Sequence, residues 1–284
     1  MHKLSYNSSK HTTEDGHMKT TQDLHVHTHL SICAEPFATP EAYIEKALEI
    51  GLTSLGIADH LWDSAVPLDD HPWKGFYGEQ NYAHTALSRE EFAKIDTKGI
   101  RILFGAEGEY DPVNHGIGLT EEVCQKLDFL LIPNSHTHMM MPKDYYEPKQ
   151  KHADFMLKAY FDIINCPLSG YITSIAHPFA AVACKPYPSG DLYPLISYNQ
   201  YKEAFDAAKE KSIAFEINTS GLLKYTKDEI KSLPRLDVFR IAKECGCKFT
   251  FGSDAHQPES LESIRCADLL REILKLTDED ILTI

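Results

Sequence analysis

Long apolar runs and positive charge are what this 284-residue chain lacks. No apolar run approaches the roughly 20 residues that span a bilayer, so no membrane partner is expected. Lysine and arginine number 28 against 42 acidic residues, which gives a formal net charge of -14. A field of that sign repels phosphodiester backbones, so extended contact with nucleic acid is not expected. Only a bound metal ion would invert this field locally.

Cysteine spacing is equally uninformative, because the seven cysteines follow no zinc-finger or disulfide pattern. The pair Cys245 and Cys247 could bind metal, but free thiols in a reducing cytoplasm are the simpler interpretation, and the cytoplasm is the expected location. The first residues lack an apolar segment typical of a signal peptide. We expect residues 1–20 to be a polar, flexible extension and residues 21–284 to form one domain.

Short apolar runs alternate with amphipathic stretches along the rest of the chain. Residues 40–51 predict a helix that begins at Pro40 and stops at Gly51. Similar stretches occupy residues 150–165, 199–211 and 235–246. The apolar positions of the first helix share one face: Tyr43, Ile44, Ala47 and Leu48. Alternation of strands and helices predicts a parallel sheet with helical crossovers.

Nearly every predicted strand ends in a residue type that binds metal. The runs that end this way are "TSLGIADH", "RILFGAE", "DFLLIPNSH", "ITSIAHP", "IAFEIN" and "KFTFGSDAH". A doubly wound sheet would gather such residues mainly at one switch point. An α/β barrel instead collects them from all strands at one face, so a TIM-like barrel is favoured.

The first strand carries three histidines at alternate positions, in "DLHVHTHLS". Side chains alternate along a strand, so His25 and His27 point to the same side and can chelate one ion together. Asp23 is a candidate to orient them. Imidazole and carboxylate suit Zn²⁺, Mn²⁺ or Fe²⁺. The candidate ligands outnumber what one catalytic ion needs, so two to three ions are expected.

Taken in order, the segments "DLHVHTHLS", "GIADH", "GAEGEY", "NSHTH", "IAHPF", "EINTSG" and "GSDAH" resemble the PHP (polymerase and histidinol phosphatase) superfamily, and histidinol-phosphatase-type phosphoesterases within it. The resemblance implies a distorted seven-stranded (β/α) barrel with a trinuclear metal centre. It also implies hydrolysis of phosphate esters. A small phosphorylated metabolite is the expected partner, and the oligomeric state stays open.

The resemblance also implies a role for each matching residue. The first ion is expected on His25, His27, Glu107 and Asp254. Glu107 then bridges to a second ion on His136 and His177, and a third ion lies on His60 and His256. Asp59 is either a supporting partner or an acid/base group, and Asp254 and His256 are candidates for proton transfer as well as metal binding.

The resemblance further implies one more ligand of the third ion, often a histidine or an acid, from the loop after the first strand. Counting forward from His27 leads to Cys33, whereas counting back from His60 through the helix leads to Glu35. Loops absorb insertions and helices do not, so Glu35 is the preferred ligand. Glu109, two residues after Glu107, is a weaker candidate for the site. Glu216 and Asn218 are expected to shape the pocket.

Lys224 and Lys185 are the candidates to bind the substrate phosphate, because a phosphomonoester needs donors beyond the metals. Leu223 stands where the resembling phosphatases tend to have arginine, which argues against histidinol phosphate itself as the substrate. The predicted chemistry is attack on phosphorus by a metal-bound hydroxide. The alternatives are a metal-dependent amidohydrolase, disfavoured because glutamate occupies the bridging position, and a non-catalytic metal-binding module.

Overall fold

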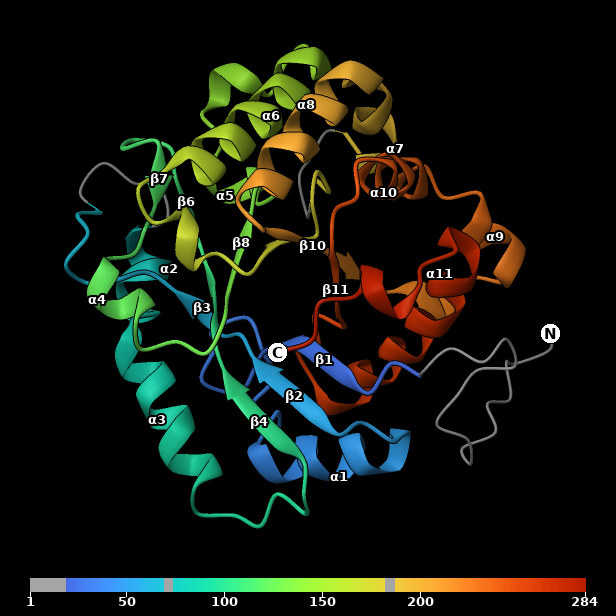
Figure 1. Cartoon of the computed structure of the whole chain (residues 1–284). Coiled ribbons are helices and arrows are strands. Elements are labelled where there is room, and N and C mark those ends of the chain that lie inside the picture. The colour runs from blue at the N-terminus through green and yellow to red at the C-terminus, as the bar shows by residue number, and fades with distance from the viewer. Residues whose placement is uncertain (1–18, 69–73, 182–186) are drawn as a thin grey trace.

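The computed structural model describes residues 19–68, 74–181 and 187–284. Strands occupy the centre of the molecule and helices surround them (Figure 1). The polypeptide ends beside strand β1, near the middle of the view in Figure 1. None of the helices in the described ranges is long and apolar enough to cross a membrane.

Two parallel sheets and one small antiparallel pair make up the strand layer. The three-stranded sheet has the order β1-β2-β4, with β1 (Gln22–Val26), β2 (Ser54–Ile57) and β4 (Arg101–Phe104). The six-stranded sheet has the order β11-β10-β9-β8-β5-β3. Its strands are β3 (His60–Leu61), β5 (Ala106–Gly108), β8 (Leu130–Pro133), β9 (Ser174–Ala176), β10 (Ala214–Asn218) and β11 (Phe249–Gly252). The antiparallel pair is β6 (Tyr110–Asp111) with β7 (Gly116–Ile117).

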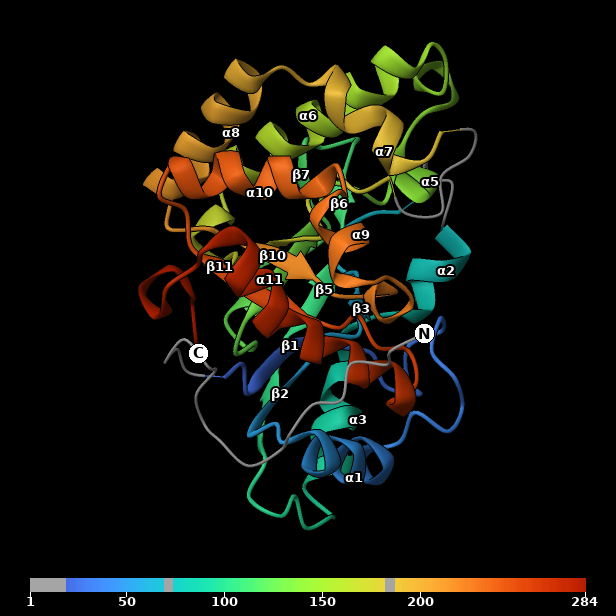
Figure 2. The same ribbon diagram turned by 90° about the vertical axis from the view of Figure 1, so that its right-hand side faces the viewer.

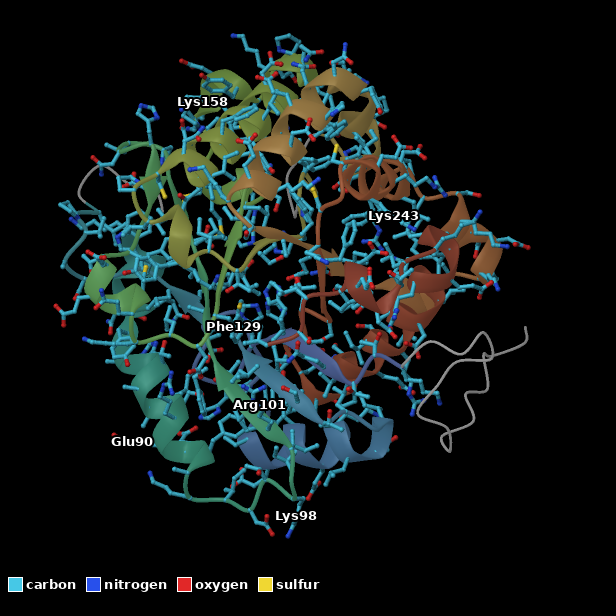
Figure 3. All side chains as sticks on the ribbon, in the orientation of Figure 1. Glu90, Lys98, Arg101, Phe129, Lys158 and Lys243 are labelled. Atoms are coloured by element: carbon cyan, nitrogen blue, oxygen red, sulfur yellow. The ribbon has the colours of Figure 1, made fainter. Side chains whose placement is uncertain are left out.

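The helices lie around this strand layer (Figure 1, Figure 2). The longer ones are α1 (Pro40–Ile50), α3 (Tyr82–Phe92), α6 (Lys149–Asn165), α8 (Tyr198–Glu210), α10 (Arg235–Glu244) and α11 (Cys266–Leu274). The shorter ones are α2 (Lys74–Glu79), α4 (Glu121–Cys124), α5 (Thr137–Met140), α7 (Ser189–Leu192) and α9 (Lys227–Lys231) (Figure 2). Lys158 on α6 and Lys243 on α10 lie at the periphery, whereas Phe129 lies inside (Figure 3).

The capping residues and the apolar spacing of helix α1 account for its bounds and for most of its buried face. The Thr39 hydroxyl accepts a hydrogen bond from the Ala42 amide at the N-terminus, and Gly51 ends the helix with a φ of 83°. Tyr43, Ile44 and Ala47 are buried as predicted. Leu48 is 45% exposed, so its predicted place on the buried face was wrong. The buried stripe is therefore narrower than the predicted one.

The predicted alternation of strands and helices is confirmed, and so is a mixed α/β fold with parallel sheets. The predicted helices at 150–165, 199–211 and 235–246 correspond to α6, α8 and α10. The backbone ladders among the described residues define two parallel sheets, not one closed barrel. The chain passes directly from β2 to β3 through Ala58 and Asp59, and from β4 to β5 through Gly105.

The first and last strands also meet. A bridge pairs Val26 with Ala255 in parallel, the Asp254 amide donates to the His25 carbonyl at 2.8 Å, and the His27 amide donates to the Ala255 carbonyl at 2.9 Å. Gly252 allows this approach: a Cβ there would lie 2.5 Å from the Cβ of His25. The carboxyl ends of β1 and β11 therefore deliver their polar residues to the same place.

Candidate metal centre

His25 on β1 and His27, directly after the strand, lie side by side, as the alternation predicts. The side chains of His25 and His27 are completely buried, and their Nε2 atoms lie 3.1 Å apart. Leu24 and Val26, at the intervening positions, belong to the apolar core. Both imidazoles therefore point away from the apolar contacts of the strand, into a shared polar interior.

Glu107, at the centre of β5, lies between two sets of histidines. Its Oε2 faces His25, His27 and His60, with distances of 3.4, 3.5 and 3.3 Å to Nε2, Nε2 and Nδ1 respectively. Its Oε1 faces His136 Nε2 at 3.4 Å and His177 Nε2 at 2.9 Å. One carboxylate that offers a different oxygen to each set has the geometry of a bridging ligand.

Asp254 joins the set around β1 from the segment after β11. Its Oδ1 lies 3.3 Å from His27 Nε2 and 3.6 Å from His25 Nε2. Both Asp254 (φ 55°) and His177 (φ 27°) have left-handed backbone conformations, which are uncommon outside glycine. Strained residues of this kind persist where the surrounding structure holds them, and they concentrate at functional sites.

Three of the histidines are oriented by a hydrogen bond to the ring nitrogen that faces away from Glu107. His25 Nδ1 donates to Glu216 Oε2 at 2.6 Å, and His136 Nδ1 donates to Glu109 Oε1 at 2.6 Å. Ser135 Oγ lies 2.6 Å from His177 Nδ1. Metal-binding histidines commonly have such a partner, which fixes the tautomer and leaves the other nitrogen free for an ion.

Two buried atoms of the cluster are unsatisfied in the described part of the chain. His60 Nδ1 and Glu109 Oε2 have no hydrogen-bond partner there. A buried polar atom without a partner costs free energy, and a coordinated cation would supply the missing interaction. The donors are histidine nitrogens and carboxylate oxygens, the set expected for Zn²⁺, Mn²⁺ or Fe²⁺. The residues present therefore fit divalent transition metals.

The electrostatics of the metal-free cluster depend on the balance of burial and charge. Burial alone would raise the pKa of Glu107, but His136, His25 and His60 hold that pKa well below its usual range. Burial lowers the pKa of His27 to about 4. Glu107 is thus an anion and His27 a neutral base, the forms in which each binds a metal.

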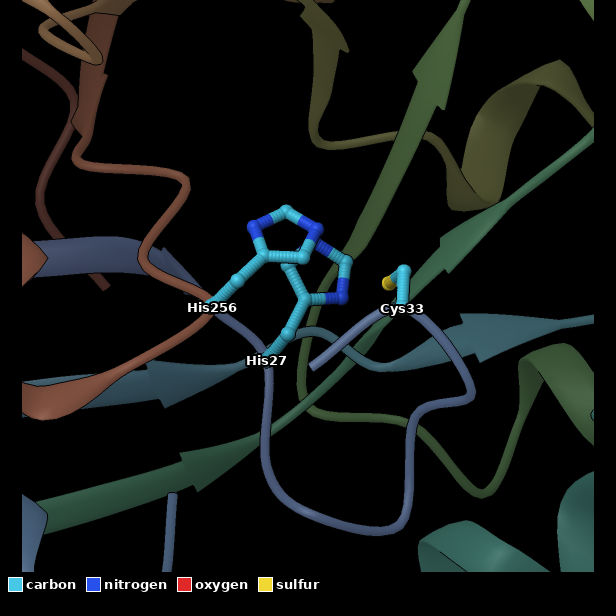
Figure 4. A group of neighbouring side chains, drawn as sticks. All are labelled: His27, Cys33 and His256. Carbon is cyan, nitrogen blue, oxygen red and sulfur yellow. The ribbon is translucent and has the colours of Figure 1, made fainter. Parts of the chain in front are cut away.

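The loop after β1 brings a sulfur atom to the cluster. His27, Cys33 and His256 offer ligand atoms that lie within 4.8 Å of one another (Figure 4). Glu35, the preferred ligand in the sequence analysis, is exposed and belongs to none of the groups in the described residues that could hold an ion. Its amide donates to the His256 carbonyl at 2.9 Å, so its backbone, not its carboxylate, contacts this segment. The geometry favours the alternative, Cys33.

Asp59 supports the loop after β1 through contacts with Thr28. Its two carboxylate oxygens accept hydrogen bonds from the Thr28 amide (2.6 Å) and the Thr28 hydroxyl (2.7 Å). Burial raises the pKa of Asp59 to about 7, although these hydrogen bonds oppose the shift. Of the two roles expected for Asp59, these contacts fit the supporting one.

The candidate phosphate-binding residues are not brought to the cluster by any described contact. Lys224 is exposed, and its Nζ lies 5.0 Å from the ring centroid of Tyr225. Lys185 lies outside the described residues, as does nearly all of the predicted extension 1–20. His29, the third histidine of the first strand, faces Glu91 at 3.5 Å.

Sequence reasoning underestimated Glu109 and missed Ser135. Glu109 is completely buried and forms a group with His60 and His136 that could hold an ion. Its spacing of two from Glu107 was the available signal. Ser135 directly precedes His136 but contacts His177, which directly follows the neighbouring strand β9, so only the pairing of β8 with β9 reveals its role.

Residues 23–220, well over half of the chain, match the model of the PHP domain. The chain therefore belongs to the PHP domain family, and the predicted resemblance is confirmed. Such a chain is a hydrolase of the phosphatase class, as its relatives are named.

Two relatives match along most of their length. A Deinococcus radiodurans protein named "Probable histidinol-phosphatase" is 27% identical, with 87% of this chain and 91% of the relative covered. A Clostridium novyi protein named as a probable phosphatase is 26% identical, covering 90% of this chain and 91% of its own. The crystal structure of a Lactococcus lactis histidinol phosphate phosphatase superposes with a TM-score of 0.62 at 19% identity, over 89% of this chain and 93% of that one. At this identity the likeness concerns the fold.

Proposed function

We propose that this protein is a metal-dependent phosphomonoesterase that hydrolyses a small phosphorylated metabolite at a site for two or three ions. The observation that carries the proposal is Glu107, whose two oxygens face two separate sets of histidines. The crystallised Lactococcus lactis phosphatase contains zinc, L-histidinol and phosphate, which supports the same class of ligand here.

Under this proposal each ion has its own set of residues. His25, His27, Asp254 and Glu107 would hold the first ion, and Glu107 would share the second with His136 and His177. His60 and His256 would contribute to a third. The two parallel sheets would together form the distorted seven-stranded barrel, with β2/β3 and β4/β5 each counted as one strand. The contact of β1 with β11 supports such a closure.

Bound divalent ions would supply Lewis acidity towards the phosphoryl oxygens and would lower the pKa of a coordinated water. The protein supplies orientation: Glu216, Glu109 and Ser135 hold three imidazoles with one nitrogen facing the ions. His256 and Asp254 lie at the more open side of the cluster, with side chains 36% and 18% exposed. That position suits them to exchange a proton with a leaving alcohol.

A phosphate dianion is the proposed substrate group, because divalent ions at the cluster would attract it. Ions would offset the overall charge of -14 locally and attract a phosphate dianion. Lys224 and Lys185 remain our candidates for the remaining phosphate oxygens. Leu223 is 52% exposed and offers no donor where related phosphatases tend to have arginine, so histidinol phosphate is one substrate to test among several.

The test pairs metal quantitation with a panel of phosphomonoesters that includes histidinol phosphate, sugar phosphates and nucleotides. His177→Ala should lose metal and turnover together, because His177 is 2.9 Å from Glu107. His115→Ala is the matched control, since His115 is exposed and contacts Asp162 and Lys158 instead. Normal metal content and turnover in His177→Ala would refute the assignment of the second ion.

Two other outcomes would replace the proposal. Hydrolysis of amides or lactones without hydrolysis of any phosphate ester would indicate an amidohydrolase. Less than one bound ion per chain together with no esterase activity would indicate a non-catalytic module. Either result is obtained from the same purified protein and the same metal measurement.

A further inference from the structure

The loop between β1 and α1 contributes a thiol to a cluster otherwise built from histidines and carboxylates. Cys33 Sγ lies with the ring nitrogens of His27 and His256 in one compact group, and the sulfur faces the two rings in Figure 4. The two imidazole rings stack with centroids 4.3 Å apart. Three side chains from two distant parts of the chain thus meet at one point.

The loop is fixed in this conformation by hydrogen bonds at both ends. The Thr28 amide and hydroxyl bind Asp59, and the Glu35 amide binds the His256 carbonyl. Between these anchors the buried Ser31 hydroxyl lies 3.3 Å from Cys33 Sγ and 3.5 Å from His27 Nδ1. Cys33 is an exposed residue, but these contacts fix the loop with Cys33 Sγ next to the histidines.

A second observation points to a ligand here. The side chain of His60 is only 7% exposed, and its Nδ1 has no hydrogen-bond partner among the residues described. His60 also forms a group with His27 and Glu107 that could hold an ion. His27 is common to both groups, so His60 and Cys33 both lie close to its imidazole. His60 Nδ1 faces Glu107 Oε2 at 3.3 Å and Glu109 Oε1 at 3.5 Å, so a cation near His60 would also offset these buried carboxylates.

We propose that Cys33 is a thiolate ligand of the third metal ion, together with His256 and His60, in place of the histidine or acid usual at this position. The inference rests on the proposed metal-dependent function and makes it more specific. A thiolate is a soft ligand that favours Zn²⁺ or Fe²⁺, whereas Mn²⁺ prefers carboxylate and water. This site should therefore select zinc or iron over manganese, unlike a site made of oxygen and nitrogen donors alone.

Cobalt(II) substitution tests the ligation directly, because a thiolate bound to Co²⁺ produces a charge-transfer band in the near ultraviolet. We expect the band in the fully loaded wild-type protein, and we expect Cys33→Ser to abolish it and to lose one ion per chain. Cys33→Asp should keep the ion and lose the band. Cys245→Ser is the matched control, because Cys245 ends α10 and belongs to none of the described metal-binding groups.

Zinc affinity gives the size of the effect. Cys33→Ser should lower the zinc affinity of the third site by about 100-fold or more. Loss of a residue that only hydrogen-bonds a ligand already lowers metal affinity by up to about 100-fold, and loss of a ligand should cost at least as much. Glu35→Gln is the competing arm: loss of one ion in this variant, with the ion retained in Cys33→Ser, would overturn the proposal. A fully loaded wild-type protein without the band would overturn it too. Unchanged thermal unfolding of metal-free Cys33→Ser establishes that the variant folds.

The role of Cys33 and the proposed phosphomonoesterase function can be refuted independently. Phosphomonoesterase activity in a wild-type protein that lacks the thiolate band refutes the role of Cys33 and leaves the proposed function intact. The band in a protein inactive on every phosphate ester refutes the function and leaves the ligation intact.

Discussion

Substitution of Glu216 by glutamine removes one negative charge at nearly constant volume. Glu216 does not bind a proposed ion itself but hydrogen-bonds His25, which would. Glu216 Oε2 accepts from His25 Nδ1 at 2.6 Å, and its Oε1 accepts from Asn218 Nδ2 at 2.8 Å. Glutamine has a single carbonyl oxygen, so it can accept from one of these donors and not both. If the Asn218 contact is kept, His25 Nδ1 loses its acceptor in a buried site; if the His25 contact is kept, Asn218 Nδ2 retains only its bond of 3.3 Å to Asp254 Oδ2.

A lost buried hydrogen bond costs about 1–3 kcal/mol, and the remaining one is no longer charge-assisted. At about 1.4 kcal/mol per factor of ten, we expect zinc affinity at the His25 site to fall by about 10- to 100-fold. Competition with a chromophoric chelator at fixed pH measures this loss. Glu122→Gln is the matched control, since that side chain is 80% exposed and pairs only with Lys126 among the described residues.

Excess metal separates a positioning role from a direct catalytic one. If Glu216 acts by orienting His25, saturating zinc should restore most of the turnover of Glu216→Gln. Affinity within a factor of about two of the wild-type value would refute the reasoning, because the lower limit expected for loss of such a partner is about ten-fold. Persistent loss of turnover at full metal occupancy would instead assign Glu216 to the chemistry.

Three further perturbations follow from the same geometry. Gly252→Ala should destabilise the protein by about 1–3 kcal/mol, because its Cβ would lie 2.5 Å from His25 Cβ and 3.0 Å from Glu216 Cδ; an unchanged urea midpoint would contradict this close approach. Thr28→Val should cost about 1–3 kcal/mol by leaving an Asp59 oxygen unpaired, measured in the same way against Thr53→Val, whose hydroxyl is exposed. Removal of metal by a chelator should lower the thermal midpoint, since an ion at 100 times its dissociation constant adds about 2.7 kcal/mol; equal midpoints with and without metal would contradict a buried site.

The sequence was a good guide wherever strand periodicity decided the outcome. His25 and His27 alternate with Leu24 and Val26, and the two-residue period alone assigns them to one side. The ends of successive parallel strands meet at one edge, so Glu107 was expected near the histidines before any contact was known. Side chains alternate regularly along a strand, and parallel strands end at a common edge. Residues placed by these two rules, such as His25, His27 and Glu107, are therefore predictable.

Side-chain contacts between neighbouring strands were harder to predict when the two residues lie at different positions along their strands. Ser135 hydrogen-bonds His177 on the next strand, and Glu109 hydrogen-bonds His136 although it lies beyond the end of β5. Each role depends on which strands are neighbours and on how far each extends. A single sequence suggests the strand order but does not give its relative shifts.

In the loop after β1, the spacing rule and the geometry favour different residues. Counting back from His60 through the helix leads to Glu35. Such a count gives a position along the chain, but it does not give the direction of a side chain. The Glu35 amide hydrogen-bonds the carbonyl of His256, and the Glu35 residue is exposed. The anchor lies near the opposite end of the sequence, where no local pattern refers to the loop. Cys33, two residues earlier, is exposed as well, but its Sγ lies 3.3 Å from the Ser31 hydroxyl and is grouped with ring nitrogens of His27 and His256. A ligand supplied by a loop is thus determined by the distant residues that hold the loop, so the choice between a thiol and a carboxylate needed the three-dimensional structure.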